Sequence, residues 1–421
     1  MKLSSFGEKL TNGSGIVDLM NDLGSALNEN PNMIFMGGGN PARIPQMEAI
    51  FKAQYKKLIE SSEQLYSTTG VYQSPQGEQG FRREIAAMLN KQFDWPVTEE
   101  NIAISNGSQS AFYILFNLLA GQMPDGSFKT IHLPLTPEYI GYNDLGLSEK
   151  FFTGSKPEIE LIGDDQFKYH VNFDNLDIDA NTAALCVSRP TNPTANVLTD
   201  DEVKHLDSLA KKADIPLIID GAYGVPFPNI NFVDVEPHWN NNTILVLSLS
   251  KLGLPGVRTG IVIASKEVTK AFSNANTVIN LASGNIGPSL TRDLFASDKI
   301  VDLSKQYVQP FYKQRSQQVM ALFQQAMTDI PCRIHLSEGA IFLWLWFEGL
   351  PITSEALYQR LKQRGVLVVS GHHFFAGIDH DWPHQHQCIR VSYGQDLSEI
   401  KQGIKIIAEE AKLAYQQGQG K

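Results

Sequence analysis

Cysteine is scarce in this chain of 421 residues. The three cysteines, Cys186, Cys332 and Cys388, are odd in number and stand in apolar surroundings. A disulfide framework needs paired and more numerous cysteines, so the sequence predicts reduced thiols and, with them, a cytoplasmic location.

Long hydrophobic runs and an excess of basic residues are also lacking. The longest apolar stretch, residues 340–347, is far shorter than the roughly 20 residues of a membrane-spanning helix. Residues 1–6 contain no apolar signal core. The 35 Lys and Arg residues against 45 Asp and Glu residues give a net charge of -10, which disfavours a nucleic-acid or anionic-membrane surface. We therefore expect neither nucleic acid nor membrane among the partners.

The chain does contain the alternating strand and helix patterns of an α/β protein. Between residues 46 and 295, apolar runs alternate with helical periods, which is typical of a mostly parallel sheet flanked by helices. The predicted strands are residues 101–105, 130–134, 183–188, 215–220, 244–248 and 259–264. The predicted helices are residues 108–120, 200–213 and 267–276. Such sheets bind ligands beyond the carboxyl ends of their strands.

The length predicts more than one domain. Residues 1–45 form the predicted N-terminal arm, with a helix near 15–28 and a glycine-rich turn at 36–41, and join the smaller domain. Residues 46–295 form the large ligand-binding domain. Residues 296–421 form a smaller α+β domain, with predicted helices at 303–327, 354–364 and 397–416 and predicted strands at 340–347, 366–369 and 388–392.

Lys251 is the residue that folding alone explains least. It follows the apolar run 243–248, and its amine can form a Schiff base with a carbonyl cofactor. Ser248, Ser250 and Arg258 can hold a phosphate beside it, because hydroxyls are compact donors and guanidinium groups match phosphate oxygens. The alternative for a single lysine is a side chain whose stem packs at a strand end.

Two further sites favour the same ligand. Ser108 and Gln109 open a helix after Gly107, where free N–H groups and the helix dipole favour a phosphate, although Ser108 could simply cap the helix. Asp220 ends an aliphatic strand, with Tyr223 three residues on, and a buried carboxylate needs a partner such as a protonated ring nitrogen. The alternative for Asp220 is a capping or turn residue.

The remaining candidates lie in loops and in the last strand. Asn192 stands between two prolines that fix its loop, and its amide could bind a phenolate oxygen together with Tyr223. Tyr139 could stack on an aromatic ring. Arg390 lies in an apolar strand, where either a substrate carboxylate or a structural salt bridge would satisfy it.

The histidines give no metal signal. His372, His373, His384 and His386 match no standard zinc spacing, so we expect no metal and interpret them as loop residues near the mouth of the site.

Together these residues resemble the pyridoxal-phosphate-dependent aminotransferases of fold type I, in the aspartate aminotransferase class. The resemblance covers essentially the whole chain. It is carried by an ordered set of motifs: Gly39-Asn-Pro, Tyr72-x-x-Pro-x-Gly, Asn106-Gly-Ser-Gln, Asn192-Pro-Thr, Asp220-x-Ala-Tyr, Ser-x-Ser-Lys251, Arg258 and Ile-Arg390.

The resemblance implies pyridoxal 5'-phosphate as the cofactor and a role for each position. Lys251 would form the Schiff base and move the proton. Asp220 would pair with the ring nitrogen, Asn192 and Tyr223 with the ring hydroxyl oxygen, and Tyr139 would stack on the ring. The phosphate would be bound by Ser108, Gln109, Ser248, Ser250 and Arg258. Tyr72 would reach the phosphate of the neighbouring subunit in a homodimer. Gly39, Asn192 and Arg390 would receive the substrate carboxylate.

Three positions depart from the family pattern. Ala195 stands where glycine is usual, Gly221 where Asn or Glu is frequent, and Ser370 where proline is common. These positions lie outside the expected contacts, so they bear on loop geometry.

Residues 137–142, 223–228 and 248–256 are most similar to the bacterial valine–pyruvate aminotransferases within the family. The expected reaction therefore converts valine and pyruvate into 3-methyl-2-oxobutanoate and alanine. The alternatives are a C–S lyase or another class I aminotransferase, of aromatic or broad specificity, on the same scaffold. A regulatory protein is disfavoured because only about forty residues precede the sheet domain and the net charge is -10.

Overall fold

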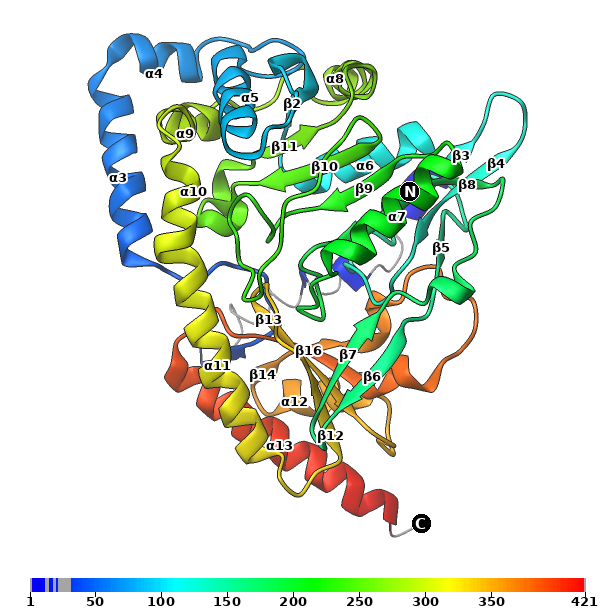
Figure 1. Ribbon diagram of the computed structural model, residues 1–421. Coiled ribbons are helices and arrows are strands. Elements are labelled where there is room, and N and C mark those ends of the chain that lie inside the picture. Colours follow the sequence, from blue (N-terminus) through cyan, green and yellow to red (C-terminus); the bar gives the residue numbers. More distant parts are fainter. Residues whose placement is uncertain (1, 12–14, 18–19, 22–31, 420–421) are drawn as a thin grey trace.

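The computed structural model describes residues 2–11, 15–17, 20–21 and 32–419. Figure 1 shows an upper layer of green and cyan strands and a lower group of orange and green strands, with the yellow helices α10 and α11 running beside them in turn. The described residues thus build two large sheets, stacked along the long axis of the molecule, and a small two-stranded one.

The upper sheet is the mostly parallel one that the sequence predicts. Its strand order is β2-β11-β10-β9-β8-β4-β3, with β5 paired to β4. Strands β8, β9 and β10 are parallel and buried along their whole length, because their residues are almost all aliphatic. Strand β11 is antiparallel to both of its neighbours. The bounds are β2 (Ile102–Ser105), β3 (Gly121–Gln122), β4 (Phe128–Leu133), β5 (Phe152–Gly154), β8 (Thr182–Ser188), β9 (Leu217–Asp220), β10 (Thr243–Ser248) and β11 (Gly260–Ile263).

Helices cover this sheet. In Figure 1, α5 and α8 lie at its upper end, and α7 lies in front of β9 and β8. Helix α7 begins with a capping box, in which Thr199 and Glu202 satisfy each other's backbone N–H groups. The helices of this part are α3 (Pro45–Glu60), α4 (Ser62–Thr69), α5 (Gln79–Phe93), α6 (Ser108–Leu119), α7 (Asp200–Lys212), α8 (Lys266–Asn280) and α9 (Ile286–Ala296).

The lower sheet has the order β15-β16-β13-β12-β7-β6. Its strands are β6 (Glu158–Ile162), β7 (Gln166–His170), β12 (Cys332–His335), β13 (Phe342–Phe347), β15 (Val369–Ser370) and β16 (Cys388–Ser392). The hairpin of β6 and β7 comes from the middle of the chain and pairs with β12 through Ile334 and Gln166. The predicted 46–295 unit therefore contributes one hairpin to the sheet of the C-terminal part.

The later C-terminal helices pack on this lower sheet and on one another: α11 (Gln309–Ala326), α12 (Ser354–Gln363) and α13 (Leu397–Gln419). The short helix α10 (Lys299–Leu303) instead contacts α9. A short π-helical stretch, Ser304–Val308, joins α10 to α11, so the predicted helix 303–327 begins earlier than expected and contains this irregular stretch. Among the described residues, no helix combines the length and the apolar character of a bilayer span.

One prediction about the short strands needs correction. The predicted strand 366–369 is two strands: β14 (Val366–Leu367) pairs with β1 (Ile34–Phe35), whereas β15 pairs with β16. The chain changes partner at Val368, which no local pattern indicates. The predicted helix near 15–28 is helical at residues 15–17 and 20–21, and its other residues lie outside the described ones. Helix α1 (Ser5–Thr11) was not predicted.

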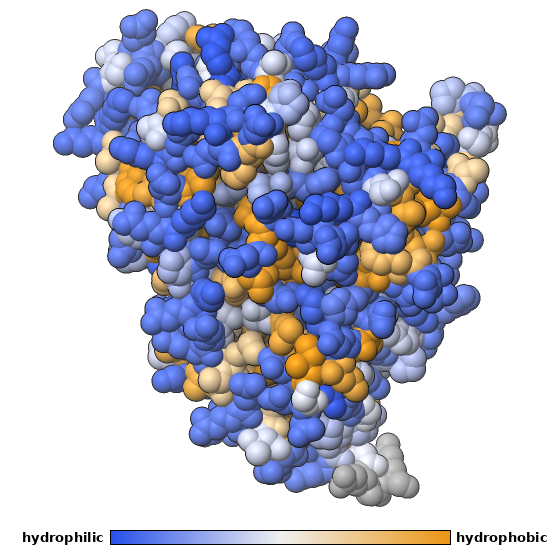
Figure 2. All heavy atoms as spheres, in the orientation of Figure 1, coloured by the Kyte–Doolittle hydropathy of each residue, from blue (hydrophilic) through white to orange (hydrophobic). Residues whose placement is uncertain are grey.

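The buried apolar side chains come from the strands and from the helices that pack on them. Figure 2 shows that hydrophilic residues cover most of one face, with hydrophobic patches across the middle and the lower half. The largest fully buried side chains include Trp344, Tyr142 and Tyr169. The core therefore continues from the upper sheet into the lower one and leaves the cavity described next between them.

Candidate active site

A cavity of 540 Å³ opens where strands β8, β9 and β10 end, and residues of both sheets line it. Nearly all of the residues predicted from the sequence meet here: Gly39, Ser108, Gln109, Tyr139, Asn192, Asp220, Tyr223, Ser248, Ser250, Lys251, Arg258 and Arg390. The carboxyl ends of parallel strands share one edge of a sheet, which explains the convergence of the residues from β8, β9 and β10.

Lys251 lies in a short helical turn directly after β10. Its Nζ donates to the backbone carbonyl of Gly39 at 2.5 Å and lies 5.2 Å from the centre of the Tyr223 ring. The pKa of Lys251 is lowered to about 8, mainly by burial and then by the positive charge of Arg390, while the Asp220 carboxylate opposes both effects. The amine is therefore easier to deprotonate than an exposed lysine.

Asp220 ends β9, and residue 246 of β10 is its parallel neighbour in the sheet. Its Oδ1 accepts a hydrogen bond from the Ala222 N–H at 2.9 Å, and its Oδ2 accepts one from the Tyr142 hydroxyl at 2.6 Å. Burial raises the pKa of Asp220, whereas these hydrogen bonds lower it. A cationic partner in the cavity would favour the ionised carboxylate.

Asn192 and Arg390 form a direct pair. Nη1 of Arg390 donates to Oδ1 of Asn192 at 2.7 Å, and Nη2 donates to the carbonyl of Gly37 at 2.6 Å. Nε of Arg390 is buried and finds no hydrogen-bond partner in the described part of the chain. Burial lowers the pKa of Arg390 to about 10, and the ring of Phe342 lies 4.1 Å from its guanidinium carbon. No carboxylate partner of Arg390 is found among the described residues, so the structural salt bridge weighed from the sequence is absent there.

The expected phosphate ligands gather at the start of α6. Gly107 precedes this helix with φ at 91°, and a Cβ atom there would lie 2.3 Å from Nη2 of Arg258. The guanidinium thus lies directly against the Gly107 backbone. The Ser248 and Ser250 hydroxyls are 2.9 Å apart, and Gln109 donates to the Gly141 carbonyl at 3.2 Å. This arrangement places a cation, hydroxyls and a helix N-terminus around one space.

Tyr139 and Tyr223 supply the aromatic walls. Burial raises the pKa of both hydroxyls, so each stays protonated and can donate a hydrogen bond. Tyr72 lies apart from the other predicted residues. It does not line the cavity, and 81% of it is exposed.

Sequence reasoning missed two residues behind the cavity, Tyr142 and Glu138. Glu138 is buried and accepts hydrogen bonds from the N–H and the hydroxyl of Ser188, and burial raises its pKa to about 8. Tyr142 has a usable signal, because it follows Tyr139 by three residues in the turn that carries the ring-stacking candidate. Glu138 has no local signal beyond its place next to Tyr139.

The four histidines do not share one environment. His384 is 4% exposed, lies among aromatic rings and contacts the Tyr169 hydroxyl, so placing it at the mouth of the site was wrong. His373 does lie beside Gly15, near the cavity-lining Ile140. The possible ligand atoms of Glu355, His372 and His373 all lie within 4.8 Å of one another. The absence of a metal stays a prediction.

Comparison with known proteins then identifies the family. The family model for aminotransferase class I and II matches residues 159–407. The valine–pyruvate aminotransferase of Escherichia coli (strain K12) is 49% identical over 415 residues, which is 99% of each chain. The chain belongs to the class I and II aminotransferases. It is therefore an enzyme that transfers amino groups.

Solved structures of similar proteins agree with this membership. A putative amino-acid aminotransferase from Psychrobacter arcticum 273-4 superposes with a TM-score of 0.96, at 45% identity over 99% of both chains. The valine–pyruvate aminotransferase of Salmonella typhimurium LT2 superposes with a TM-score of 0.88, at 46% identity over 96% of this chain and 100% of the other. The α/β architecture predicted from the sequence is confirmed, as is the resemblance to this family.

Proposed function

We propose that this aminotransferase uses pyridoxal 5'-phosphate to convert valine and pyruvate into 3-methyl-2-oxobutanoate and alanine. The observation that carries the proposal is the cavity shared by the Lys251 amine and the Asp220 carboxylate, which come from adjacent strands. The 49% identity to the Escherichia coli valine–pyruvate aminotransferase supports this substrate pair.

The residues present fit the cofactor. A phosphate needs donors and a cation, which Ser108, Ser250 and Arg258 offer at the start of α6. A cationic ring nitrogen needs a buried carboxylate, and Asp220 is buried, with no cationic side chain of the described residues within salt-bridge distance. The donor set thus matches the anionic end and the cationic end of one molecule.

When bound, the cofactor supplies an aldehyde carbon and a ring that withdraws electrons. Lys251 would hold the cofactor through its neutral amine, and the same Nζ would move the proton of the substrate α-carbon. Asp220, which the Tyr142 hydroxyl orients, would hold a proton on the ring nitrogen. Asn192 and Tyr223 would bind the ring hydroxyl oxygen, and Tyr139 would pack against the ring. The phosphate would be bound by Ser108, Gln109, Ser248, Ser250 and Arg258.

The substrate side of the cavity combines a cation with apolar walls. Arg390, the Asn192 amide and the Gly39 backbone would receive the α-carboxylate, for which the unpaired Nε of Arg390 provides a further donor. Ile16, Met20 and Ile140 line the same cavity. Apolar walls favour small aliphatic side chains over charged ones, as the substrate pair requires.

The active form would be a homodimer. Tyr72 is 81% exposed and lies outside its own cavity, as expected of a side chain that reaches the phosphate of a second subunit. The location in the cytoplasm stays a prediction from the cysteine content.

The test is turnover of purified protein with the cofactor. Valine and pyruvate should give alanine and 3-methyl-2-oxobutanoate in equal amounts, whereas Lys251→Ala should retain noncovalently bound cofactor and lose turnover. Release of pyruvate from cystathionine without transamination would instead identify a C–S lyase. Faster transamination of aromatic amino acids than of valine would identify an aromatic or broad aminotransferase.

A further inference from the structure

The loop that carries Asn192 contains an unfavourable backbone conformation. Ala195 has φ at 63°, the left-handed region that glycine adopts far more readily than alanine. Ala195 is fully buried, and its N–H donates to the Thr191 carbonyl at 2.9 Å. A loop in such a shape needs contacts from outside to hold it.

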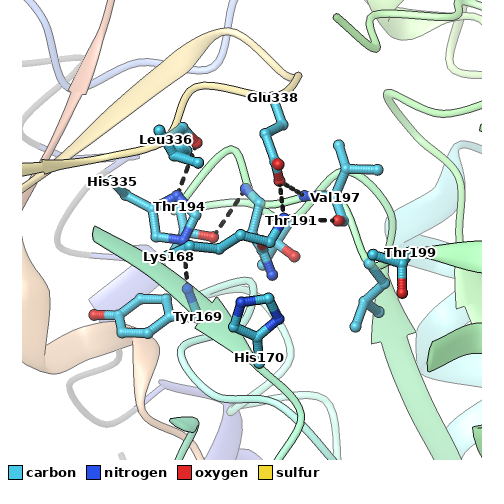
Figure 3. Close-up of polar contacts among 12 residues, drawn as sticks. Lys168, Tyr169, His170, Thr191, Thr194, Val197, Thr199, His335, Leu336 and Glu338 are labelled. Atoms are coloured by element: carbon cyan, nitrogen blue, oxygen red, sulfur yellow. Dashed lines mark hydrogen bonds and ion pairs between the residues drawn. The ribbon is translucent and has the colours of Figure 1, made fainter. Parts of the chain in front are cut away.

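Glu338 provides such contacts at Ala195 and two residues after it. Its backbone N–H donates to the Ala195 carbonyl at 3.1 Å, and its carboxylate accepts from the Val197 N–H at 3.0 Å. Figure 3 shows the Glu338 side chain reaching toward Val197, with Thr191 and Thr194 close by. Glu338 thus forms two hydrogen bonds with the backbone of the turn, one at Ala195 and one at Val197.

Lys168 fixes the Glu338 carboxylate in turn. Its Nζ forms an ion pair with Oε2 of Glu338 and also donates to the Val197 carbonyl at 3.3 Å. The side chains of Lys168 and Glu338 are only 9% and 14% exposed, so water screens the pair weakly. The two residues together bind both the N–H and the carbonyl of Val197.

The pair belongs to the lower sheet, while the loop belongs to the upper one. Lys168 lies on β7, and Glu338 follows β12, the parallel partner of β7. The segment continues into β13, whose Phe342 lies beneath Arg390. Glu338 therefore lies between the loop that positions Asn192 and the strand that supports Arg390, the two residues that meet in the cavity.

We propose that the Lys168–Glu338 ion pair is a positioning device for the active site. It holds the left-handed Ala195 turn, and thereby sets Asn192 against Arg390, without touching substrate or cofactor. The inference rests on the proposed roles of Asn192 and Arg390. It also explains how this chain accommodates alanine at a position with positive φ.

The test uses the holoenzyme and the substitutions Glu338→Gln, Lys168→Met and Ala195→Gly, alone and combined. Glu338→Gln should raise KM for valine about tenfold, because one charged hydrogen bond to the loop is lost. It should also shift the pH titration of the cofactor absorbance and speed hydrogen exchange at residues 190–197. Glycine at 195 relieves the strain, so Ala195→Gly should change little alone and restore most of the loss in the double variant.

Glu348→Gln is the matched control, because it breaks the Arg333 ion pair of the same sheet far from the loop. A fall in thermal stability alone, with KM and exchange at 190–197 as in the control, would overturn the inference. So would a Glu338→Gln defect that Ala195→Gly leaves unchanged. Lys168→Met tests the ion pair independently, since it removes the lysine charge and keeps the hydrogen bond from the Glu338 N–H to the Ala195 carbonyl. If the wild-type enzyme fails to transaminate valine, the proposed function fails, whereas the exchange measurements still decide the role of the pair.

Discussion

The Tyr142 hydroxyl donates a hydrogen bond of 2.6 Å to Oδ2 of Asp220, in a layer directly behind the cavity. Tyr142 is fully buried, and its ring packs edge-on against Phe116 at 5.3 Å. Asp220 therefore faces the cavity as an already oriented acceptor.

Tyr142→Phe should weaken catalysis while keeping the fold. The substitution retains the ring packing and removes one hydrogen bond that lowers the pKa of Asp220. A hydrogen bond to a charged group contributes about 1.5–3 kcal/mol, so we expect kcat to fall at least about tenfold. Tyr415→Phe is the control, since that hydroxyl bonds the Pro331 and Glu348 carbonyls away from the cavity. Equal kcat values for both variants would contradict a role for Tyr142.

The rate of cofactor attachment should depend on pH through Lys251. The neutral amine attacks the aldehyde, and the neutral fraction grows as the pH rises through the pKa of about 8. The rate measured by mixing apoprotein with pyridoxal phosphate should therefore level off above about pH 9, far below the range of an ordinary lysine. Arg390→Gln removes a charge that lowers this pKa, so the midpoint should move upward. A rate that still climbs steeply at about pH 10 would refute the lowered pKa.

Arg390→Lys should impair substrate binding selectively. Lysine keeps the charge but cannot donate to Asn192, Gly37 and a carboxylate in the planar fork of arginine. We expect KM for valine and for pyruvate to rise by about tenfold to a hundredfold, with the cofactor still bound. Arg315→Lys is a fitting control, because Arg315 also lies over an aromatic ring, that of Phe311, and donates to the Gln395 carbonyl. Similar KM values for the two variants would rule out Arg390 as the carboxylate receptor.

Gly107→Ala should loosen the cofactor. The new Cβ would meet Nη2 of Arg258 at 2.3 Å, so the guanidinium must leave the start of α6. We expect faster loss of cofactor on dialysis against phosphate buffer, followed by absorbance. Gly126→Ala is the control. Gly126 has a similar φ of 87°, so this variant carries the same backbone strain, but no atom of the described residues lies within 4 Å of the added Cβ. It therefore shows the effect of strain without the steric clash. A Gly107 variant that retains cofactor as firmly as the Gly126 variant would count against this phosphate site.

The buried strands were predictable because each is a continuous run of mostly apolar residues. Residues 388–392 match β16, and the predicted 183–188 and 244–248 each fall one residue short of β8 and β10. Several site residues were predictable for the same reason, because Asp220 and Ser248 end such strands, whereas Asn192 and Lys251 follow them. The structure places all the predicted site residues except Tyr72 in one cavity, although their individual roles stay predictions.

The hairpin of β6 and β7 was not predictable in this way. Residues 158–162 alternate Glu158 and Glu160 with Ile159 and Leu161, but the strand is short and largely exposed, so it lacks the continuous apolar run that marked the other strands. The hairpin joins the lower sheet through β7, whose partner β12 lies far along the chain, and local patterns carry no information about such pairing. The Lys168–Glu338 pair was missed with them, because it exists only once the hairpin joins the second sheet.

The segment that follows β1 has a practical consequence for anyone shortening this protein. The carbonyls of Gly37 and Gly39 are the acceptors for the guanidinium of Arg390 and the amine of Lys251. A shortened protein that starts beyond residue 40 would lack these acceptors, so both positive groups would be buried without them. Such a fragment should be expected to precipitate or unfold, so expression trials are better begun ahead of Ile34.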